Sequence, residues 1–116
     1  MRRTSPKSHC PVNYALEAIG DPWSLLIVRD IVFHNKQTFR EFLRSDEKIA
    51  TNILQARLSS LLAQGILYKA PHPTDRRKEV YSLTKKGEAL IPILTAMVHW
   101  SARFDPATSA AQLESR

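Results

Sequence analysis

Apolar residues in the first third of the chain recur at helical spacing. Four of them share one predicted helix face within residues 11–19: Val12, Ala15, Leu16 and Ile19. Gly20 is expected to end this helix, and Asp21-Pro22 then supplies an N-cap acceptor followed by proline at the first helical position. Residues 23–34 are apolar on almost every side. We therefore expect this second helix to lie buried at the centre of the domain.

The central segment predicts two further helices. Thr38-Phe39-Arg40-Glu41 matches a capping box, in which the Thr38 hydroxyl and the Glu41 carboxylate each accept a backbone N–H of the other residue. A polar turn follows at residues 45–48, and the next helix is predicted over residues 49–64, with Gly65 after its end. The residues expected to face inward are Ala50, Leu54, Leu58, Leu61 and Leu62. The opposite face is small and polar: Asn52, Ala56, Ser59 and Ala63.

A β-hairpin and a last helix are predicted next. Strand-like residues 66–69 and 79–83 enclose a basic, turn-rich segment, residues 70–78. Thr84 is expected to cap a helix running from residue 85 to about residue 103. Pro92 would either kink this helix or lie where its missing N–H is tolerated.

This order predicts a mainly α fold with a small β-hairpin (α+β), a winged helix-turn-helix. The 116 residues fit one domain, which we expect over residues 10–104 between flexible tails at residues 1–9 and 105–116. No apolar run approaches the roughly 18–20 residues that span a bilayer, and no secretory signal is visible. A single cysteine, Cys10, excludes an internal disulfide framework. A cytoplasmic protein without membrane contact is therefore expected.

Positive charge gathers in the middle of the chain. The formal net charge is +6, and residues 36–86 hold eleven Lys and Arg residues against five acidic residues. A basic patch on a small domain indicates a polyanionic partner, and double-stranded DNA is the partner that the predicted fold favours. Charge alone leaves open a basic protein with no such partner.

The predicted second helix of the helix-turn-helix carries the candidate base-reading residues. Asn and Gln can bind adenine through two hydrogen bonds, and Thr can contact the thymine methyl group. The candidates are Thr51, Asn52, Gln55, Ala56, Arg57 and Ser59. The same residue types are also ordinary on a solvated helix.

Cations at the hairpin tip are the second candidate group. Arg76, Arg77 and Lys78 could neutralise phosphates or enter the minor groove, and Arg40 could add a phosphate contact. The alternative is a charged loop that only keeps the protein in solution.

Nothing in the sequence indicates catalysis or a cofactor. The four histidines are scattered, and with one cysteine they give no zinc-ligand spacing. No phosphate-binding glycine loop, paired-carboxylate motif or nucleophile elbow occurs. We expect neither an enzyme nor a bound metal.

Several segments, in order, resemble the HxlR family of transcription regulators. They are Cys10-Pro11-Val12, Ala15-Leu16, Ile19-Gly20, Trp23, Leu25–Arg29, Phe39–Phe42, Ile49–Leu54, Arg57-Leu58, Gly65–Leu67, Tyr81–Thr84 and Gly87. The resemblance covers about residues 10–100 and implies a homodimer, joined through its terminal helices, on an inverted-repeat operator at a promoter. Many relatives have Ser-Pro where this chain has Ala50-Thr51, so Thr51 is either a cap or a base reader. The tip, Asp75-Arg76-Arg77, is also similar to the wing of the MarR family.

Cys10 is a candidate redox or electrophile sensor, because some relatives use a cysteine at this place. A thiol just ahead of a helix start is also expected to have a lowered pKa. The alternative is an inert thiol, and no effector ligand is indicated. The rival function is a winged-helix protein-interaction module without specific DNA binding, which the small Ala56, Ser59 and Ala63 face would suit.

Overall fold

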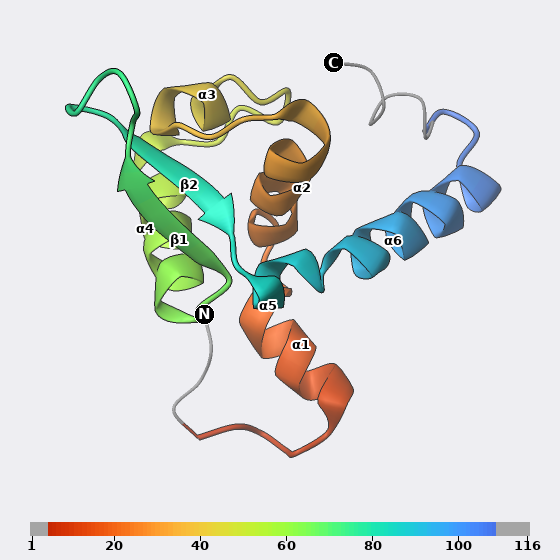
Figure 1. Cartoon of the computed structure of the whole chain (residues 1–116). Helices are drawn as coiled ribbons and strands as arrows, with labels where there is room; N and C mark the ends of the chain where they lie inside the picture. Colours follow the sequence, from red (N-terminus) through yellow and green to blue (C-terminus); the bar gives the residue numbers. More distant parts are fainter. Residues whose placement is uncertain (1–4, 109–116) are drawn as a thin grey trace.

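Six helices and one β-hairpin follow one another in the computed structural model, which describes residues 5–108 (Figure 1). The elements are α1 (Pro11–Ile19), α2 (Ser24–His34), α3 (Phe39–Leu43), α4 (Thr51–Ala63), β1 (Leu67–Pro71), β2 (Glu79–Leu83), α5 (Lys85–Glu88) and α6 (Ile91–Phe104). The predicted α+β winged helix-turn-helix is confirmed. Of the tails expected at residues 1–9 and 105–116, residues 1–4 and 109–116 lie outside the described residues.

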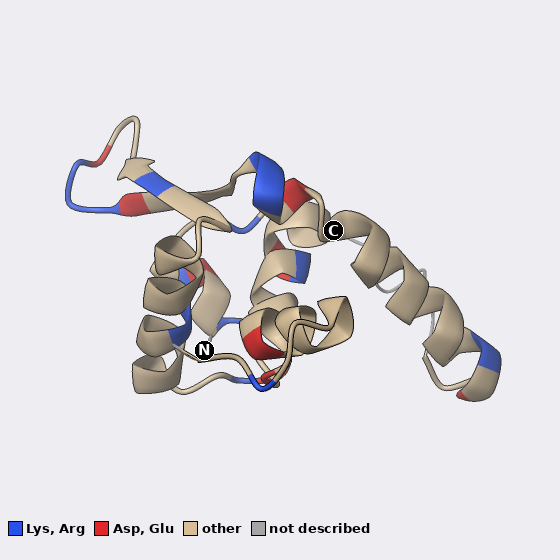
Figure 2. Ribbon diagram, turned by 90° about the horizontal axis from the view of Figure 1, so that it is seen from below, with Lys and Arg blue, Asp and Glu red and all other residues tan. Residues whose placement is uncertain are grey.

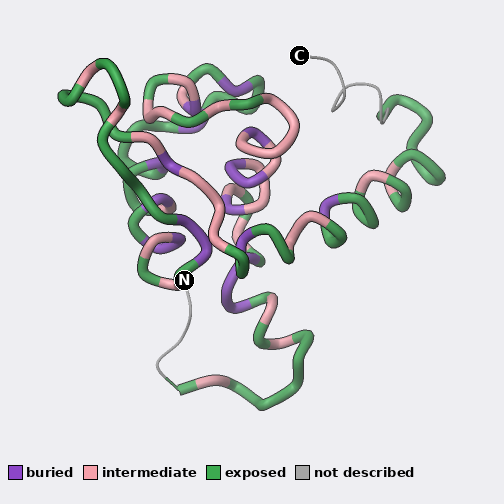
Figure 3. Tube along the Cα trace, in the orientation of Figure 1, coloured by how far each residue is buried: buried purple, intermediate pink, exposed green. Residues whose placement is uncertain are grey.

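The core lies where α2, α3 and α4 meet the inner face of the hairpin. Phe42, Leu54 and Leu58 are at most 1% exposed, and Phe42 meets Tyr81 of β2 edge to face at 6.1 Å between ring centroids. Figure 3 shows the buried residues concentrated in this part of the chain. The predicted inward residues of α4 are confirmed except Ala50, which is exposed and serves as the N-cap.

The hairpin is anchored to the helical body. β1 and β2 pair antiparallel from Leu67 opposite Leu83 to Pro71 opposite Glu79, so β1 runs two residues further than predicted. The Tyr81 N–H donates to the carbonyl oxygen of Gln37 at 2.8 Å. This bond ties the hairpin to the segment that leads into α3.

Local signals set several helix ends. The N-cap predicted at Asp21 is wrong, because the N-cap of α2 is Trp23 and the helix begins at Ser24. The Thr38–Glu41 capping box is formed, and Gly65 has a φ of +71°, the left-handed conformation expected after α4. The single predicted last helix is wrong, because the chain forms α5 and then α6. Pro92 lies in the first turn of α6, where a backbone N–H has no intrahelical acceptor, so the missing donor costs no helix hydrogen bond.

The terminal helices expose apolar residues. On α1, Ile19 is buried, but Val12 and Leu16 on the same predicted face are 66% and 61% exposed. α6 extends away from the rest of the molecule (Figure 1). Of the helices within residues 5–108, none is long and apolar enough to cross a membrane.

Candidate nucleic-acid interface

The outward side of α4 presents small and polar residues to solvent. This α4 outer face consists of Thr51, Asn52, Gln55, Ala56 and Ser59, all exposed. Within the described residues none of these side chains makes a hydrogen bond. Thr51 is the first helical residue, and Ala50 is the N-cap without a side-chain cap bond, so Thr51 does not cap the helix. The polar groups of this face are free to bind an external partner.

Arg57 is placed differently from the other α4 candidates. Its side chain is 20% exposed, and its Nη1 lies 3.7 Å from Oδ1 of Asp21. Asp21 also accepts the backbone N–H groups of Trp23 and Ser24, at 3.0 and 2.9 Å. Burial raises the pKa of Asp21, but hydrogen bonds from Ser24 and Trp23 outweigh it and lower the pKa overall. Arg57 therefore faces the start of α2 instead of joining the α4 outer face.

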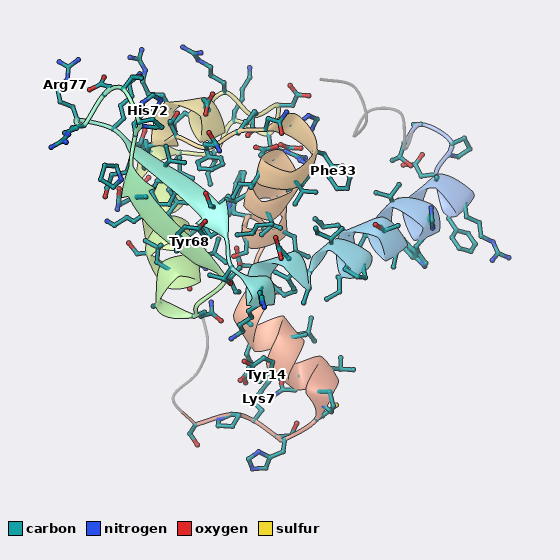
Figure 4. The ribbon with its side chains drawn as sticks, viewed as in Figure 1. Lys7, Tyr14, Phe33, Tyr68, His72 and Arg77 are labelled. Atoms are coloured by element: carbon teal, nitrogen blue, oxygen red, sulfur yellow. The ribbon has the colours of Figure 1, made fainter. Side chains whose placement is uncertain are left out.

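Three consecutive cations occupy the tip of the hairpin, which comprises residues 72–78. Arg76 and Lys78 are exposed and form no ion pair within residues 5–108. The Arg77 side chain is 89% exposed, and its Nε lies 3.1 Å from Oδ1 of Asp75. Figure 2 shows this blue tip and a second group of cations on α5, and Figure 4 shows Arg77 at the outer end of the tip. Arg40 is exposed on α3.

A charged network holds the turn between α3 and α4, and sequence reasoning missed it. This turn network comprises Arg29, Asp30, Lys36, Ser45 and Glu47. Arg29 donates to both Glu47 oxygens, at 2.7 and 2.8 Å, and to Asp30 at 2.8 Å. Asp30, only 2% exposed, also accepts the Ser45 hydroxyl and lies 3.5 Å from Lys36 Nζ.

The turn network fixes the approach to α4. The hydrogen bonds to Glu47 raise the pKa of Arg29 and lower the pKa of Glu47. Because Ser45 and Glu47 lie in the segment before α4, their bonds to α2 set where α4 begins. The available sequence signal was an acid inside an otherwise apolar helix, which must find partners when buried.

Cys10 is exposed and is the N-cap residue of α1. The nearby backbone amides of Asn13 and Val12 at the start of α1 hold the pKa of its thiol below the ordinary value. This agrees with the effect expected of a helix N-terminus, and it raises the fraction of reactive thiolate at neutral pH. Within residues 5–108, no group of three His, Cys, Asp or Glu side chains could hold a metal ion.

An apolar stripe runs along α6. The α6 stripe comprises four exposed residues at helical spacing: Ile93, Met97, Trp100 and Phe104. Their exposed fractions lie between 39% and 69%, and the rings of Trp100 and Phe104 are 5.8 Å apart. The only charged residue within α6 is Arg103, in its last turn. Contiguous exposed apolar surface of this kind marks an interaction site.

The helix-turn-helix, the free polar face of α4 and the basic hairpin define a winged helix-turn-helix protein of the transcriptional-regulator class. The HxlR-like helix-turn-helix family model matches residues 18–109. The chain belongs to this family. It is 33% identical over 94 residues to the uncharacterized HTH-type transcriptional regulator YybR of Bacillus subtilis (strain 168), covering 81% of this chain and 74% of YybR.

Solved structures show the same fold. The crystal structure of PA1607, a protein assigned as a transcription factor, is 40% identical with a TM-score of 0.77, covering 85% of this chain and 68% of PA1607. The redox regulator HypR in its oxidized form is 30% identical with a TM-score of 0.69, covering 81% of this chain and 96% of HypR. The reduced form of the transcriptional regulator YodB from B. subtilis is 27% identical with a TM-score of 0.66, covering 88% of this chain and all of YodB.

Proposed function

We propose that this protein is a homodimeric regulator that binds an inverted-repeat DNA operator, with the α4 outer face in the major groove. The observation that carries the proposal is the row of exposed, unbonded Thr51, Asn52, Gln55 and Ser59 side chains beside a hairpin with exposed cations. Asn52 and Gln55 would read bases, while Thr51 and Ala56 would allow close approach and contact methyl groups. Because the Arg57 side chain forms an ion pair with Asp21, we propose no base contact for Arg57.

The cations would bind the DNA backbone. Arg76 and Lys78, which have no ion pair within the described residues, would neutralise phosphates beside the groove that α4 enters. Arg77 would act from its place beside Asp75, and Arg40 would add a phosphate contact from α3. A regulator of this kind would act in the cytoplasm, where the chromosome lies. It would act by binding DNA and would not be an enzyme.

Selection of bound sequences from a random DNA pool, followed by titrations in several salt concentrations, tests these roles. Asn52→Ala and Gln55→Ala should lose discrimination between selected and random DNA. Arg76→Ala should weaken binding to both and reduce the salt slope by about one. Gln37→Ala is a matched control for the two amide variants, because it removes a side-chain amide from an exposed residue outside the α4 outer face.

Two results would count against the proposal. Equal losses on selected and random DNA for Asn52, Gln55 and Arg76 variants would contradict the division of roles. Absence of any salt-sensitive DNA binding would favour the protein-interaction module instead.

The dimer is proposed from the apolar surface of the terminal helices. Fully burying a large apolar side chain contributes about 1.5–3 kcal/mol, and the α6 stripe offers four such side chains, with Val12 and Leu16 on α1. A two-fold dimer would place its two α4 helices on half-sites about one helical turn apart. Trp100→Glu should shift sedimentation to the monomer, whereas Tyr68→Glu, at an aromatic residue 53% exposed on β1, should not. A Trp100→Glu variant that remains dimeric would place the interface elsewhere.

We propose further that Cys10 makes DNA binding responsive to oxidants or electrophiles. The exposed thiol with its lowered pKa supports this role, as do the relatives HypR, a redox regulator, and YodB, which has a quinone-bound structure. Cys10→Ser should bind DNA normally but lose any response to diamide or quinones. If oxidised wild-type protein binds as tightly as reduced protein, the sensor role is wrong.

A further inference from the structure

His72 lies at the base of the hairpin tip and accepts backbone hydrogen bonds from it. Its Nδ1 receives the N–H groups of Thr74 and Asp75, each at 3.2 Å. The backbone N–H of His72 donates to the carbonyl oxygen of Lys78 at 3.0 Å, and the Lys78 backbone N–H donates to the carbonyl oxygen of Asp75 at 3.0 Å. The backbone of His72 therefore joins the two sides of the tip, and its imidazole accepts the amides of the turn that follows.

The turn stabilised by His72 also positions Asp75 and Arg77. The Asp75 carboxylate accepts the Arg77 backbone N–H at 3.1 Å and its guanidinium Nε and Nη2 at 3.1 and 3.3 Å. These bonds hold the pKa of Asp75 below its ordinary value. His72, Asp75 and Arg77 thus form one chain of hydrogen bonds running to the outer end of the tip.

We propose that His72 is a positioning residue that keeps the tip in its DNA-binding shape only while Nδ1 is unprotonated, so that the wing's contribution to DNA affinity depends on pH. The inference rests on the proposed function. Because both tip amides are donors, Nδ1 must present its lone pair to them, and the remaining proton of the neutral ring lies on Nε2. A proton on Nδ1 turns the acceptor into a donor that faces two other donors, and the turn opens.

Charged groups around the imidazole either favour or oppose its protonated form. Asp75 attracts a protonated ring, whereas Arg76, Arg77 and Lys78 on the tip repel it. On the strands behind the tip, Lys69 and Glu79 pair with each other at 3.3 Å and largely cancel. A protonated His72 also adds one positive charge near DNA, so a purely electrostatic role predicts tighter binding in acid, the opposite of our proposal.

The test compares wild type, His72→Asn and His72→Ala in DNA titrations at about pH 8 and about pH 5.5, the range over which imidazoles change charge. The asparagine carbonyl oxygen can accept the amides two and three residues on without titrating. Wild type should lose about three- to tenfold in affinity for a mixed-sequence duplex in acid relative to His72→Asn, the loss expected when one to two ordinary hydrogen bonds break. His72→Ala should be weak at both pH values. His99→Asn, on α6, is the matched control and should keep the wild-type profile.

Ring nitrogen chemical shifts of His72 in the free protein give a readout that does not depend on DNA. They should report Nε2–H with Nδ1 as acceptor at high pH, and the Thr74 and Asp75 amide resonances should move as His72 is protonated. The opposite tautomer, equal pH profiles for wild type and His72→Asn, or normal binding by His72→Ala would overturn the proposal. If no variant binds DNA while the nitrogen shifts are as expected, the proposed function fails and the conformational switch stands.

Discussion

Replacing Asp30 with alanine is the sharpest test of what positions the candidate interface. Asp30 is 2% exposed and is the acceptor shared by Arg29, Lys36 and Ser45. Removing it leaves the buried Ser45 hydroxyl and the half-buried Arg29 and Lys36 side chains without that partner. Breaking a buried ion pair from one side costs roughly 3–5 kcal/mol. We expect Asp30→Ala to cost somewhat less than this, about 2–4 kcal/mol, because Arg29 keeps Glu47 and the Lys36 side chain is 21% exposed and can reach water.

Glu47, at the more exposed end of the turn network, should contribute far less than Asp30 to the free energy of unfolding. The Glu47 side chain is 35% exposed, so solvent screens its attraction to Arg29. We expect Glu47→Ala to cost about 0.5–1 kcal/mol. Asp46→Ala is the control, because it removes the same charge from the same turn at an exposed residue that forms no ion pair within residues 5–108. It should leave the free energy of unfolding almost unchanged.

Urea and thermal unfolding followed by circular dichroism measure all three variants. With about 4 °C per kcal/mol for a domain of this size, Asp30→Ala should lower the melting temperature by about 8–16 °C. Glu47→Ala should lower it by a few degrees at most. Equal losses for Asp30→Ala and Asp46→Ala would refute the reasoning, because the buried carboxylate would then contribute no more than an exposed one.

Two further outcomes are expected. Gly87→Ala should destabilise the protein by about 2–4 kcal/mol in urea unfolding. The Cβ of the alanine would overlap the carbonyl oxygen of Ile66 and lie 2.8 Å from Leu83 Cδ2. A variant as stable as wild type would show that this contact can relax. Stability should also fall as the pH drops below about 4.5. Hydrogen bonds from the Gln37 amide and from Arg29 lower the pKa values of Glu41 and Glu47 in the folded protein. As the pH falls, the unfolded chain therefore binds protons before the folded protein does. Glu41→Gln should make the dependence of stability on pH shallower, and an unchanged slope would contradict the assignment.

The elements that could be predicted from sequence are those fixed by neighbouring residues. The capping box at Thr38 and Glu41 needs only residues three apart, and the left-handed Gly65 follows from the end of one helix. The small, polar face of α4 follows from helical spacing alone, and its residues are exposed as predicted. Local chemistry therefore determined the helix-turn-helix and the hairpin.

Features that depend on distant partners were not predicted. Helical spacing places Arg57 on α4, but its pairing with Asp21 depends on how α2 packs against α4. The buried hydrogen bond that Asp30 accepts could not be predicted either, because its partner Ser45 lies fifteen residues away in sequence. The close packing of α5 depends on Gly87, where only glycine lets the chain pass close to the Ile66 carbonyl, about twenty residues earlier in sequence.

The sequence pattern of α1 does not indicate which surface its apolar face packs against. The i, i+3, i+4, i+7 pattern correctly predicted a helix with an apolar side, yet Val12 and Leu16 stay exposed while Ala18 and Ile19 reach the core. Periodicity identifies an apolar face and leaves its partner undetermined. The exposed residues of α1 and the α6 stripe lie on the two terminal helices, outside the helix-turn-helix and the hairpin. In the dimer proposed above, each chain contributes to two apolar cores. One lies within the subunit around Phe42 and Leu54, and the other forms between the terminal helices of the two subunits. A dimer whose subunits join through these helices leaves both α4 faces and both hairpin tips free for DNA.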